Sequence, residues 1–501
     1  MTSLSLLAAA REVPARPALF AHGTSYSFAD LGLRAAALGA RMRSIGVGPG
    51  SRVALIARNR LETVLAILAL LEIGAAIVPV HPRLTPPEVT ALLADGSSDL
   101  LLNDADLDAL LDAPRSSSSA RSVPEEPDFS PIDPSSLFAI VHTSGTTGRP
   151  KGAMLTRAAI TASAAASAQN LGWNDADRWL ACMPLCHIGG LSIVTRCLLA
   201  RAPFILEPRF DPGSVLEAIR RDRATLLSVV PTMLQALLEA DRENLLARLR
   251  AVLVGGAGAP PALLDECARR GVLALTTYGL TEACSQVTAQ RPRDPSTREP
   301  GSGKPLAGAE IRIERDASAS ASDVGDASDV GDIGRIQIRG PMRMRAYWPQ
   351  GGPRPGEPLP ALDPAAWFDT GDLGALDEHG RLHVLARRTD LIVTGGENVY
   401  PVEVEQVLEA VPGVLRALVF GVPDERWGQI VAAALVLDPA RPASPESLAS
   451  ELTRRLAAHK RPRRLCAASA LPTTPSGKLD RASAAERFAP LLSPFPSPAP
   501  R

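Results

Sequence analysis

Short apolar strands alternate with amphipathic helices along most of this chain, and this alternation limits the fold more than any other feature of the sequence. Between residues 26 and 111 the pattern predicts a helix over Phe28–Ile45, a strand over Arg52–Ile56, a helix over Leu61–Leu71 and a strand over Ala76–Pro79. A further helix is expected after Thr85, and the same pattern runs again from Leu137 to about Gln290. Strands that alternate with helices imply parallel sheets covered on both faces.

The later part of the chain has a different pattern. Strands are expected over Ala309–Arg315, Gly334–Arg339 and Arg381–Ala386, followed by a strand over Leu391–Val393, a helix over Pro401–Ala410, strands over Val414–Phe420 and Ile430–Leu437, and a helix from Ser444. We therefore predict an α/β fold with two domains. Residues 1–388 form a large N-terminal domain of layered α/β subdomains with a β-rich subdomain, and residues 389–501 form a small, mobile α+β domain. The low-complexity segments 113–136 and 316–332 are expected to be loops.

Composition excludes several classes of protein. A chain of 501 residues exceeds the roughly 100–200 residues of one domain. With 46% hydrophobic and 21% charged residues it is neither disordered nor fibrous. Its 53 basic and 54 acidic residues give a net charge of -1, which provides no field for nucleic acid or acidic membranes. Its longest apolar stretch is broken by Glu72, Gly74 and Pro79. The N-terminus is a poor signal peptide, so we expect a cytoplasmic protein without a membrane span.

The six cysteines lie scattered in apolar contexts. Cys182, Cys186 and His187 might suggest zinc, but no second Cys/His pair stands at ligand spacing. We therefore expect buried, reduced thiols.

Lysine is unusually scarce, because only four of the 53 basic residues are lysines: Lys151, Lys304, Lys460 and Lys478. A position that keeps lysine is a candidate for a role that needs a compact ammonium group. We interpret Lys304 as shaping a loop and Lys460, beside Arg461 and Arg463, as a surface charge that could help to hold the phosphates of a ligand.

The sharpest local motif is the run HTSGTTGRPKG over residues 142–152. It follows the predicted strand Leu137–Val141 and precedes a helix expected near Thr156. Glycines let backbone N–H groups turn inward, and the hydroxyls and ammonium add donors, so the loop can hold a polyphosphate. It is not a Walker A motif, because Pro150 and Gly152 replace its second glycine and its Ser/Thr.

This loop resembles the phosphate loop of the adenylate-forming superfamily, which includes acyl- and aryl-CoA synthetases, peptide-synthetase adenylation domains and luciferases. Further runs resemble that family's motifs in the expected order: YGLTE at 278–282, TGD at 370–372, Arg387, GGEN at 395–398 and PSGK at 475–478. Ala386 departs from the usual glycine before the arginine. The resemblance covers roughly residues 15–485.

The resemblance implies a role for each matched residue. ATP or AMP would be held by Thr143, Ser144, Gly145, Thr146, Thr147, Gly148, Lys151, Tyr278, Gly279, Thr281, Asp372 and Arg387, with Glu282 binding magnesium. Lys478 would act in catalysis with Thr281, Glu282 and His187. Gly395, Gly396, Glu397 and Asn398 would meet CoA, and Thr389 would be the hinge.

Other residues point to the acyl side of the site. The bare backbone of Gly255 and Gly256, after the strand Ala251–Val254, would let an adenine or aryl ring approach closely. His187 and Gly189 stand where the family has a gate against the acyl pocket, and Ser285 and Gln286 offer hydrogen bonds to a polar substrate group. Arg196 is a candidate partner for a second carboxylate, or a residue of a solvated helix face.

Together the runs PLCHIGGLSI and YGLTEACSQ resemble the o-succinylbenzoate–CoA ligases of menaquinone biosynthesis, whose substrate is an aryl keto acid with two carboxylates. The resemblance implies that ATP, Mg²⁺ and CoA are used, first to form an acyl-adenylate and then a thioester. Alternatives are another small aryl- or fatty-acyl-CoA synthetase, a carrier-protein adenylation domain, a non-catalytic nucleotide-binding relative and a nucleotide hydrolase. The expected partners are small molecules rather than nucleic acid, and a homo-oligomer is left open.

Overall fold

The computed structural model describes residues 3–112, 133–143, 151–294, 299–315, 331–349, 352–353, 357–387, 390–394, 397–424, 427–456, 458–474 and 479–495. Within these residues the strands form four sheets of nine, six, five and four strands. The fold is mixed α/β with a separate small C-terminal unit, as predicted. Among the described helices, none combines the length and the apolar character that a membrane span needs.

The five-stranded sheet has the order β5-β3-β4-β6-β7. Its strands are β3 (Arg52–Ile56), β4 (Ala76–Val80), β5 (Leu100–Leu102), β6 (Leu137–Thr143) and β7 (Lys151–Thr156), with helices α3 (Leu61–Ile73), α4 (Pro86–Leu93) and α5 (Asp104–Asp112). All strands run parallel except β7, which is antiparallel to β6. The sequence did not predict β7, because residues 151–156 read as the end of a loop. Antiparallel pairing with β6 makes them a strand, and its residues from Gly152 to Leu155 are buried.

The nine-stranded sheet has the order β14-β13-β12-β11-β10-β8-β9-β1-β2. Its strands are β1 (Pro17–Ala21), β2 (Thr24–Ser27), β8 (Trp179–Ala181), β9 (Phe204–Leu206), β10 (Leu226–Val229), β11 (Ala251–Val254), β12 (Ala274–Leu280), β13 (Ser285–Ala289) and β14 (Lys304–Pro305). The accompanying helices are α1 (Leu6–Glu12), α2 (Phe28–Ser44), α6 (Arg157–Leu171), α7 (Ile188–Ala200), α8 (Pro212–Asp222), α9 (Pro231–Ala240), α10 (Pro261–Arg269), and the 3₁₀ helices η1 (Leu245–Arg248) and η2 (Thr281–Ala283). The central strands are parallel.

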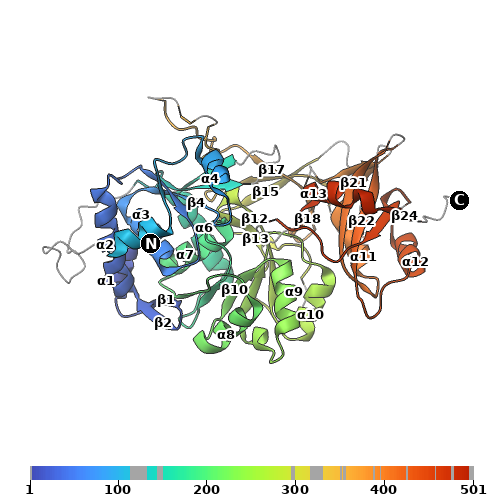
Figure 1. Ribbon diagram of the computed structural model, residues 1–501, viewed down its shortest axis with the longest axis horizontal. Helices are drawn as coiled ribbons and strands as arrows, with labels where there is room; N and C mark the ends of the chain where they lie inside the picture. Colours follow the sequence, from blue (N-terminus) through green and yellow to red (C-terminus); the bar gives the residue numbers. More distant parts are fainter. Residues whose placement is uncertain are drawn as a thin grey trace.

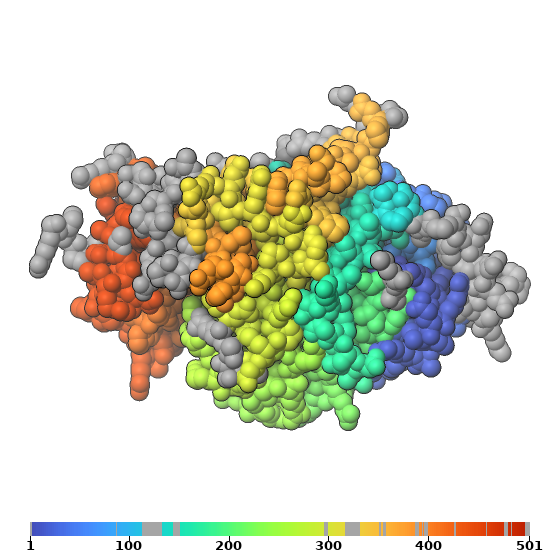
Figure 2. All heavy atoms as spheres, turned by 180° about the vertical axis from the view of Figure 1, so that it is seen from behind, coloured from blue at the N-terminus to red at the C-terminus, as the bar shows by residue number. Residues whose placement is uncertain are grey.

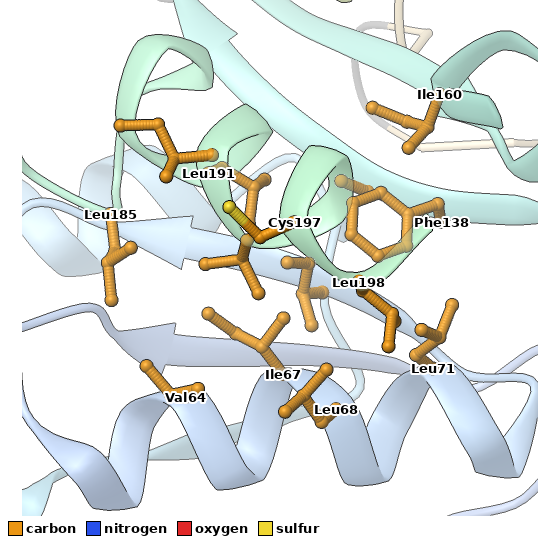
Figure 3. Close-up of a cluster of buried hydrophobic side chains, with 14 of the residues drawn as sticks. Val64, Ile67, Leu68, Leu71, Phe138, Ile160, Leu185, Leu191, Cys197 and Leu198 are labelled. Carbon is orange, nitrogen blue, oxygen red and sulfur yellow. The ribbon is translucent and has the colours of Figure 1, made fainter. Parts of the chain in front are cut away.

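Helices fill the space between these two sheets. Helix α6 begins where β7 ends, because Thr156 caps it by accepting a hydrogen bond from the Ala159 N–H. It contacts β6 and β7 on one side and β13 of the other sheet on the other. The largest core cluster lies here (Figure 3), with labelled side chains Val64, Ile67, Leu68 and Leu71 of α3 facing Leu185, Leu191, Cys197 and Leu198 near α7, and Phe138 and Ile160 beside them. This packing fixes the two sheets relative to each other.

The other two sheets belong to the later part of the chain. The antiparallel sheet β15-β16-β17-β18 consists of β15 (Glu310–Arg315), β16 (Gly334–Arg339), β17 (Phe368–Leu376) and β18 (Leu382–Arg387). The last sheet consists of β19 (Ile392–Thr394), β20 (Glu397–Val399), β21 (Val414–Asp424), β22 (Gly428–Leu437), β23 (Arg464–Ala467) and β24 (Ser493–Pro494), with α11 (Pro401–Glu409), α12 (Pro445–Arg455), α13 (Arg481–Phe488), η4 (Ala458–Lys460) and η5 (Ala489–Leu491). It forms one end of the molecule (Figure 1), and the yellow to orange residues of the four-stranded sheet lie between it and the N-terminal layers (Figure 2).

The cysteines agree with the sequence prediction, whereas Lys460 does not. All six cysteines are free, and five of them are buried, as expected. The interpretation of Lys460 as a surface charge is wrong. Its side chain is 2% exposed, and its Nζ donates a hydrogen bond to Glu403 Oε1 at 2.9 Å. An ammonium in this environment needs a carboxylate partner, and Glu403 at the start of α11 provides it.

Candidate active site

Strands β6 and β7 hold the two ends of the glycine-rich loop together. Thr143 is the last residue of β6, Lys151 is the first of β7, and the two are paired across the sheet. The Thr143 hydroxyl also donates to the Lys151 carbonyl oxygen at 3.4 Å. Residues Ser144, Gly145, Thr146, Thr147 and Gly148 lie outside the described residues. The described ends fix where the loop leaves and re-enters the sheet.

Tyr347 connects the loop to the carboxylate predicted to bind magnesium. Its hydroxyl donates to Glu282 Oε1 at 2.7 Å, and the Lys151 Nζ lies 5.5 Å from the centre of its ring. The Met344 N–H donates to the Glu282 carbonyl at 2.7 Å, so backbone and side chain of Glu282 are both held by the segment 344–347. A carboxylate fixed in this way beside a lysine is suited to bind a metal–phosphate group.

The predicted ribose residues lie on neighbouring strands. Asp372 of β17 is the cross-strand partner of Arg387 of β18. The Asp372 side chain is 8% exposed, and its Oδ2 accepts a hydrogen bond from the Tyr278 hydroxyl at 2.7 Å. Tyr278 stands on β12, in the same run as Thr281 and Glu282. The tyrosine therefore ties the nine-stranded sheet to the four-stranded sheet at the site.

The turn between β12 and β13 has an unusual backbone. Cys284 and Ser285 have φ of +53° and +101°, values that non-glycine residues rarely adopt. A Cβ on Gly279 would lie 1.8 Å from the Ser285 carbonyl oxygen, so only glycine fits opposite this turn. Strained backbone of this kind tends to occur at functional sites, where it is held by its surroundings. The turn presents Ser285, which is partly exposed, next to the run 278–282.

Gly255 and Gly256 follow β11, as the sequence predicted. A Cβ on Gly255 would lie 2.6 Å from Thr277 Oγ1, so the neighbouring strand β12 approaches its backbone closely. Gly256 has φ of +80°, a conformation that favours glycine.

On the acyl side, His187 immediately precedes α7, and its ring centre lies 5.5 Å from that of His81. The backbone before it is held by Asn59, whose Nδ2 donates to the Met183 carbonyl at 3.0 Å and whose Oδ1 accepts from the Leu185 N–H at 3.0 Å. A Cβ on Gly189 would lie 2.9 Å from Met183 Cε, so this turn is tightly packed. His187 is thus presented from a rigid loop.

Two further residues predicted to bind the acid, Gln286 and Arg196, have buried surroundings of their own. Gln286 is buried, and its Oε1 accepts a hydrogen bond from Ser167 of α6 at 3.0 Å. Arg196 is 3% exposed, which excludes a solvated helix face. Its guanidinium carbon lies 5.3 Å from the ring centre of Trp179, the first residue of β8.

His187 and Arg196 lie far apart, because His187 precedes the first residue of α7 and Arg196 lies in its second half. They are nine positions apart, and at a rise of about 1.5 Å per residue that spacing is about 13 Å along the helix axis. The placement of Arg196 does not support its predicted contact with a substrate carboxylate.

The remaining predicted residues belong mostly to the C-terminal part. Lys478, Thr389, Gly395 and Gly396 lie outside the described residues. Glu397 and Asn398 are in β20, paired through the backbone with β19. Lys304 is exposed on β14, opposite Ala289, and its interpretation as a residue that shapes a loop stays a prediction.

Sequence reasoning missed Tyr347 and His81. Tyrosine is as scarce as lysine in this chain, with four residues, and two of them donate hydrogen bonds to carboxylates of the candidate site. That scarcity was a usable signal for Tyr347. Nothing in the sequence pairs His81 with His187, because 106 positions of chain separate them.

Comparisons with known proteins identify the same family as the sequence motifs. Residues 6–348 match the AMP-binding enzyme family, and residues 403–478 match the AMP-binding enzyme C-terminal domain. The curated 2-succinylbenzoate–CoA ligase of Geobacillus kaustophilus is 38% identical over 463 residues, which cover 91% of each chain.

Solved structures give the same result. The o-succinylbenzoate CoA synthetase of Bacillus subtilis in complex with the acyl-adenylate intermediate OSB-AMP has a TM-score of 0.80 at 33% identity, covering 96% of this chain and 97% of that one. The same enzyme in complex with ATP and magnesium ion has a TM-score of 0.79 at 32% identity, covering 95% and 98%. The predicted membership of the adenylate-forming enzymes is confirmed, and this chain belongs to the AMP-binding enzyme family.

Proposed function

We propose that this chain is an ATP-dependent 2-succinylbenzoate–CoA ligase, an enzyme of menaquinone biosynthesis. It converts o-succinylbenzoate, ATP and CoA to o-succinylbenzoyl-CoA, AMP and diphosphate. The observation that carries the proposal is the 38% identity to a curated ligase of this activity over 91% of both chains. The hydrogen-bonded residues around Tyr278 and Tyr347 support it, because they join the ATP-binding segments into one site.

The first step activates the acid. A carboxylate is a poor electrophile, and transfer of AMP to it, with diphosphate leaving, gives a mixed anhydride that a thiol can attack. Negative charge gathers on the α-phosphate and carboxylate oxygens in the transition state, so catalysis is mainly electrostatic. Lys478 provides an ammonium for this charge, and the loop 143–151 holds the phosphates. No protein nucleophile is required.

The described residues fit a magnesium ion at Glu282. Its carboxylate is an oxygen ligand of the kind Mg²⁺ prefers, and the Tyr347 hydroxyl fixes one of its oxygens at 2.7 Å. Thr281 precedes it and contributes a hydroxyl. When bound, the ion neutralises charge on the departing diphosphate.

Asp372 and Arg387 bind the ribose. Asp372 would accept hydrogen bonds from the sugar and Arg387 would donate to it, and the pairing of β17 with β18 keeps the two residues opposite each other. The Tyr278 hydroxyl bonds one oxygen of Asp372 and so orients the carboxylate toward the nucleotide. Gly256, with its bare backbone, leaves room for the adenine.

The second step transfers the acyl group to CoA. The loop 395–398 meets the thiol, and the C-terminal domain, residues 389–501, rotates about Thr389 between the steps. The acid itself lies against His187, Gly189, Gly255 and Ser285. Ser285 can donate to a polar group of the substrate, since its strained turn holds it in place.

The partners in this proposal are small molecules: the dicarboxylic acid, ATP and CoA. The proposed location is the cytoplasm, where ATP and CoA are available, and cell fractionation tests it. Light scattering of the purified protein measures whether it forms a homo-oligomer.

The test is a thioester assay that depends on both ATP and CoA. We expect the rate with o-succinylbenzoate to exceed the rates with benzoate, coumarate and fatty acids by at least about tenfold, a barrier difference of about 1.4 kcal/mol. Release of AMP rather than ADP is the second readout. A preference for a fatty acid would overturn the proposed substrate, and thioester formation without AMP would overturn the reaction class.

A further inference from the structure

We propose that His81, Cys186 and His187 form a binding site for a divalent transition metal of the Zn²⁺ class. Each offers one ligand atom, and the three atoms lie within 4.8 Å of one another. Imidazole nitrogen and thiolate sulfur are the ligands that Zn²⁺ prefers in proteins. The cysteine spacing had argued against zinc, because Cys182 and Cys186 lack a second pair. The structure completes the set differently, with a histidine from a distant segment and without Cys182.

Two rigid segments present these ligands. His81 directly follows Val80, the last residue of β4, while Cys186 and His187 lie between β8 and α7. The buried Asn59 holds the second segment at Met183 and Leu185. A Cβ on Gly190 would lie 2.3 Å from the Pro184 carbonyl oxygen, which shows how tightly the turn is packed. A metal would therefore meet ligands that are already close to their bound positions.

The distances suit coordination after a small movement. Zn–N bonds of about 2.0–2.1 Å and a Zn–S bond of about 2.3 Å place the ligand atoms of a tetrahedral site roughly 3.5 Å apart. The three ligand atoms lie up to 4.8 Å apart in the structure, so the side chains must approach one another by about 1 Å or a little more when a metal binds. Three protein ligands leave the fourth position for water or another small ligand.

Protonation is the main barrier to metal binding. Burial raises the pKa of the Cys186 thiol to about 12, and the charge of Arg83 opposes that rise. The pKa of His81 is lowered by burial and by the same arginine, so its ring is held in the neutral form that a metal needs. The backbone N–H of Arg83 donates a hydrogen bond to His81 Nδ1 at 3.1 Å, so the proton of the neutral ring is on Nε2. Coordination through Nε2 would move this proton to Nδ1 and break the hydrogen bond. Binding must also displace the thiol proton.

A metal at this site would occupy the histidine proposed to face the acid. This consequence rests on the proposed function, whereas metal binding itself does not. We expect Zn²⁺ to inhibit adenylate formation in competition with the carboxylate substrate.

The test uses full-length protein freed of metal and titrated with Co²⁺. We expect one equivalent to bind with a thiolate-to-cobalt charge-transfer absorption band. Cys186→Ser should lose this band, and His81→Asn should weaken binding at least about tenfold. Cys182→Ser is the matched control, because Cys182 is also buried and lies four positions earlier in the same loop. It should keep the band. Thermal melts confirm that each variant is folded.

Absence of the band from the wild-type protein, or its persistence in Cys186→Ser, would overturn the site. In the activity arm, Zn²⁺ should inhibit wild-type pyrophosphate exchange at least about tenfold more strongly than that of His81→Asn. Equal inhibition of both would overturn the competition with the acid. A protein that binds Co²⁺ through Cys186 but shows no ligase activity would support the metal site and overturn the proposed function.

Discussion

At the scale of single residues, Tyr347 has an importance that its place in the sequence does not suggest. Its hydroxyl bonds Glu282 while its ring faces Lys151. Tyr347→Phe removes the first contact and keeps the second. Since a hydrogen bond to a charged group contributes about 1.5–3 kcal/mol, we expect kcat/KM for ATP to fall roughly 10- to 150-fold. The magnesium concentration for half-maximal rate should rise, as measured by pyrophosphate exchange.

Tyr26→Phe is the matched control for this prediction. It makes the same chemical change at a tyrosine whose ring lies 5.2 Å from the Arg34 guanidinium carbon, away from the candidate site. Equal losses in the two variants, or an unchanged magnesium requirement in Tyr347→Phe, would contradict the role given to Tyr347.

The second prediction at the scale of single residues concerns Lys478. Its ammonium is proposed to meet charge that develops in the adenylation step and not in thioester formation. Lys478→Ala should therefore reduce adenylation by roughly 100- to 1000-fold and spare transfer of preformed acyl-AMP to CoA. Lys304→Ala removes an exposed lysine of β14 and should leave both steps intact. Comparable damage to both steps in Lys478→Ala would indicate a structural role.

At the scale of elements, the packing of α11 on β21 buries an ionisable group. Glu409 ends α11, and its Oε1 accepts a hydrogen bond from the Ala417 N–H at 3.1 Å and lies 3.4 Å from the Arg416 Nε. Burial nevertheless raises the pKa of Glu409 to about 7. Between the ordinary pKa of about 4.3 and this value, the folded state binds the proton more tightly than the unfolded state. The free energy of unfolding therefore falls as pH rises through that window.

Glu409→Gln removes the titration and keeps an acceptor for Ala417. At about 1.4 kcal/mol per pKa unit, we expect the variant to gain roughly 2–3 kcal/mol relative to the wild type between pH 5 and pH 8. Denaturant unfolding at several pH values measures this gain. Glu378→Gln changes an exposed glutamate, 76% accessible, and should show no such trend. Parallel pH profiles for wild type and Glu409→Gln would refute the prediction.

At the scale of the whole molecule, a small apolar cluster of described residues joins the C-terminal unit to the four-stranded sheet. Tyr400 packs with Leu373 and Ala375 of β17, close to Asp372, and Leu391 lies at its edge. The inter-sheet core of the N-terminal part is far more extensive. A small interface of this kind is compatible with the proposed rotation of the C-terminal domain about Thr389.

Thr389→Pro tests the proposed rotation. Proline fixes φ near about -65° and should trap one orientation of the small domain. We expect adenylation to survive largely and thioester formation to fall at least about tenfold, a barrier increase of about 1.4 kcal/mol. Pyrophosphate exchange and CoA-thioester production on one preparation measure the two steps. If both rates fall together, or neither falls, the boundary between residues 388 and 389 is misplaced.

Many of the elements were predictable because short-range patterns encode them. The strand over Arg52–Ile56 and the helix from Leu61 appear where periodicity placed them. Strand β7 was missed because its apolar residues follow directly on a loop motif, and only pairing with β6 shows that they form a strand. Lys460 was misjudged because its neighbours Arg461 and Arg463 suggested a surface, whereas its partner Glu403 is 57 positions away.

The sequence by itself determined the α/β class, the order of the ATP-binding motifs and membership of the family. Each of these depends on residues that are close in the chain, where spacing directly reflects local chemistry. Only the tertiary structure decided that Tyr347 holds Glu282, that His81 joins Cys186 and His187, and that Arg196 is buried beside Trp179. Such contacts join segments that meet when sheets and helices pack, and no local pattern in the sequence specifies which segments meet.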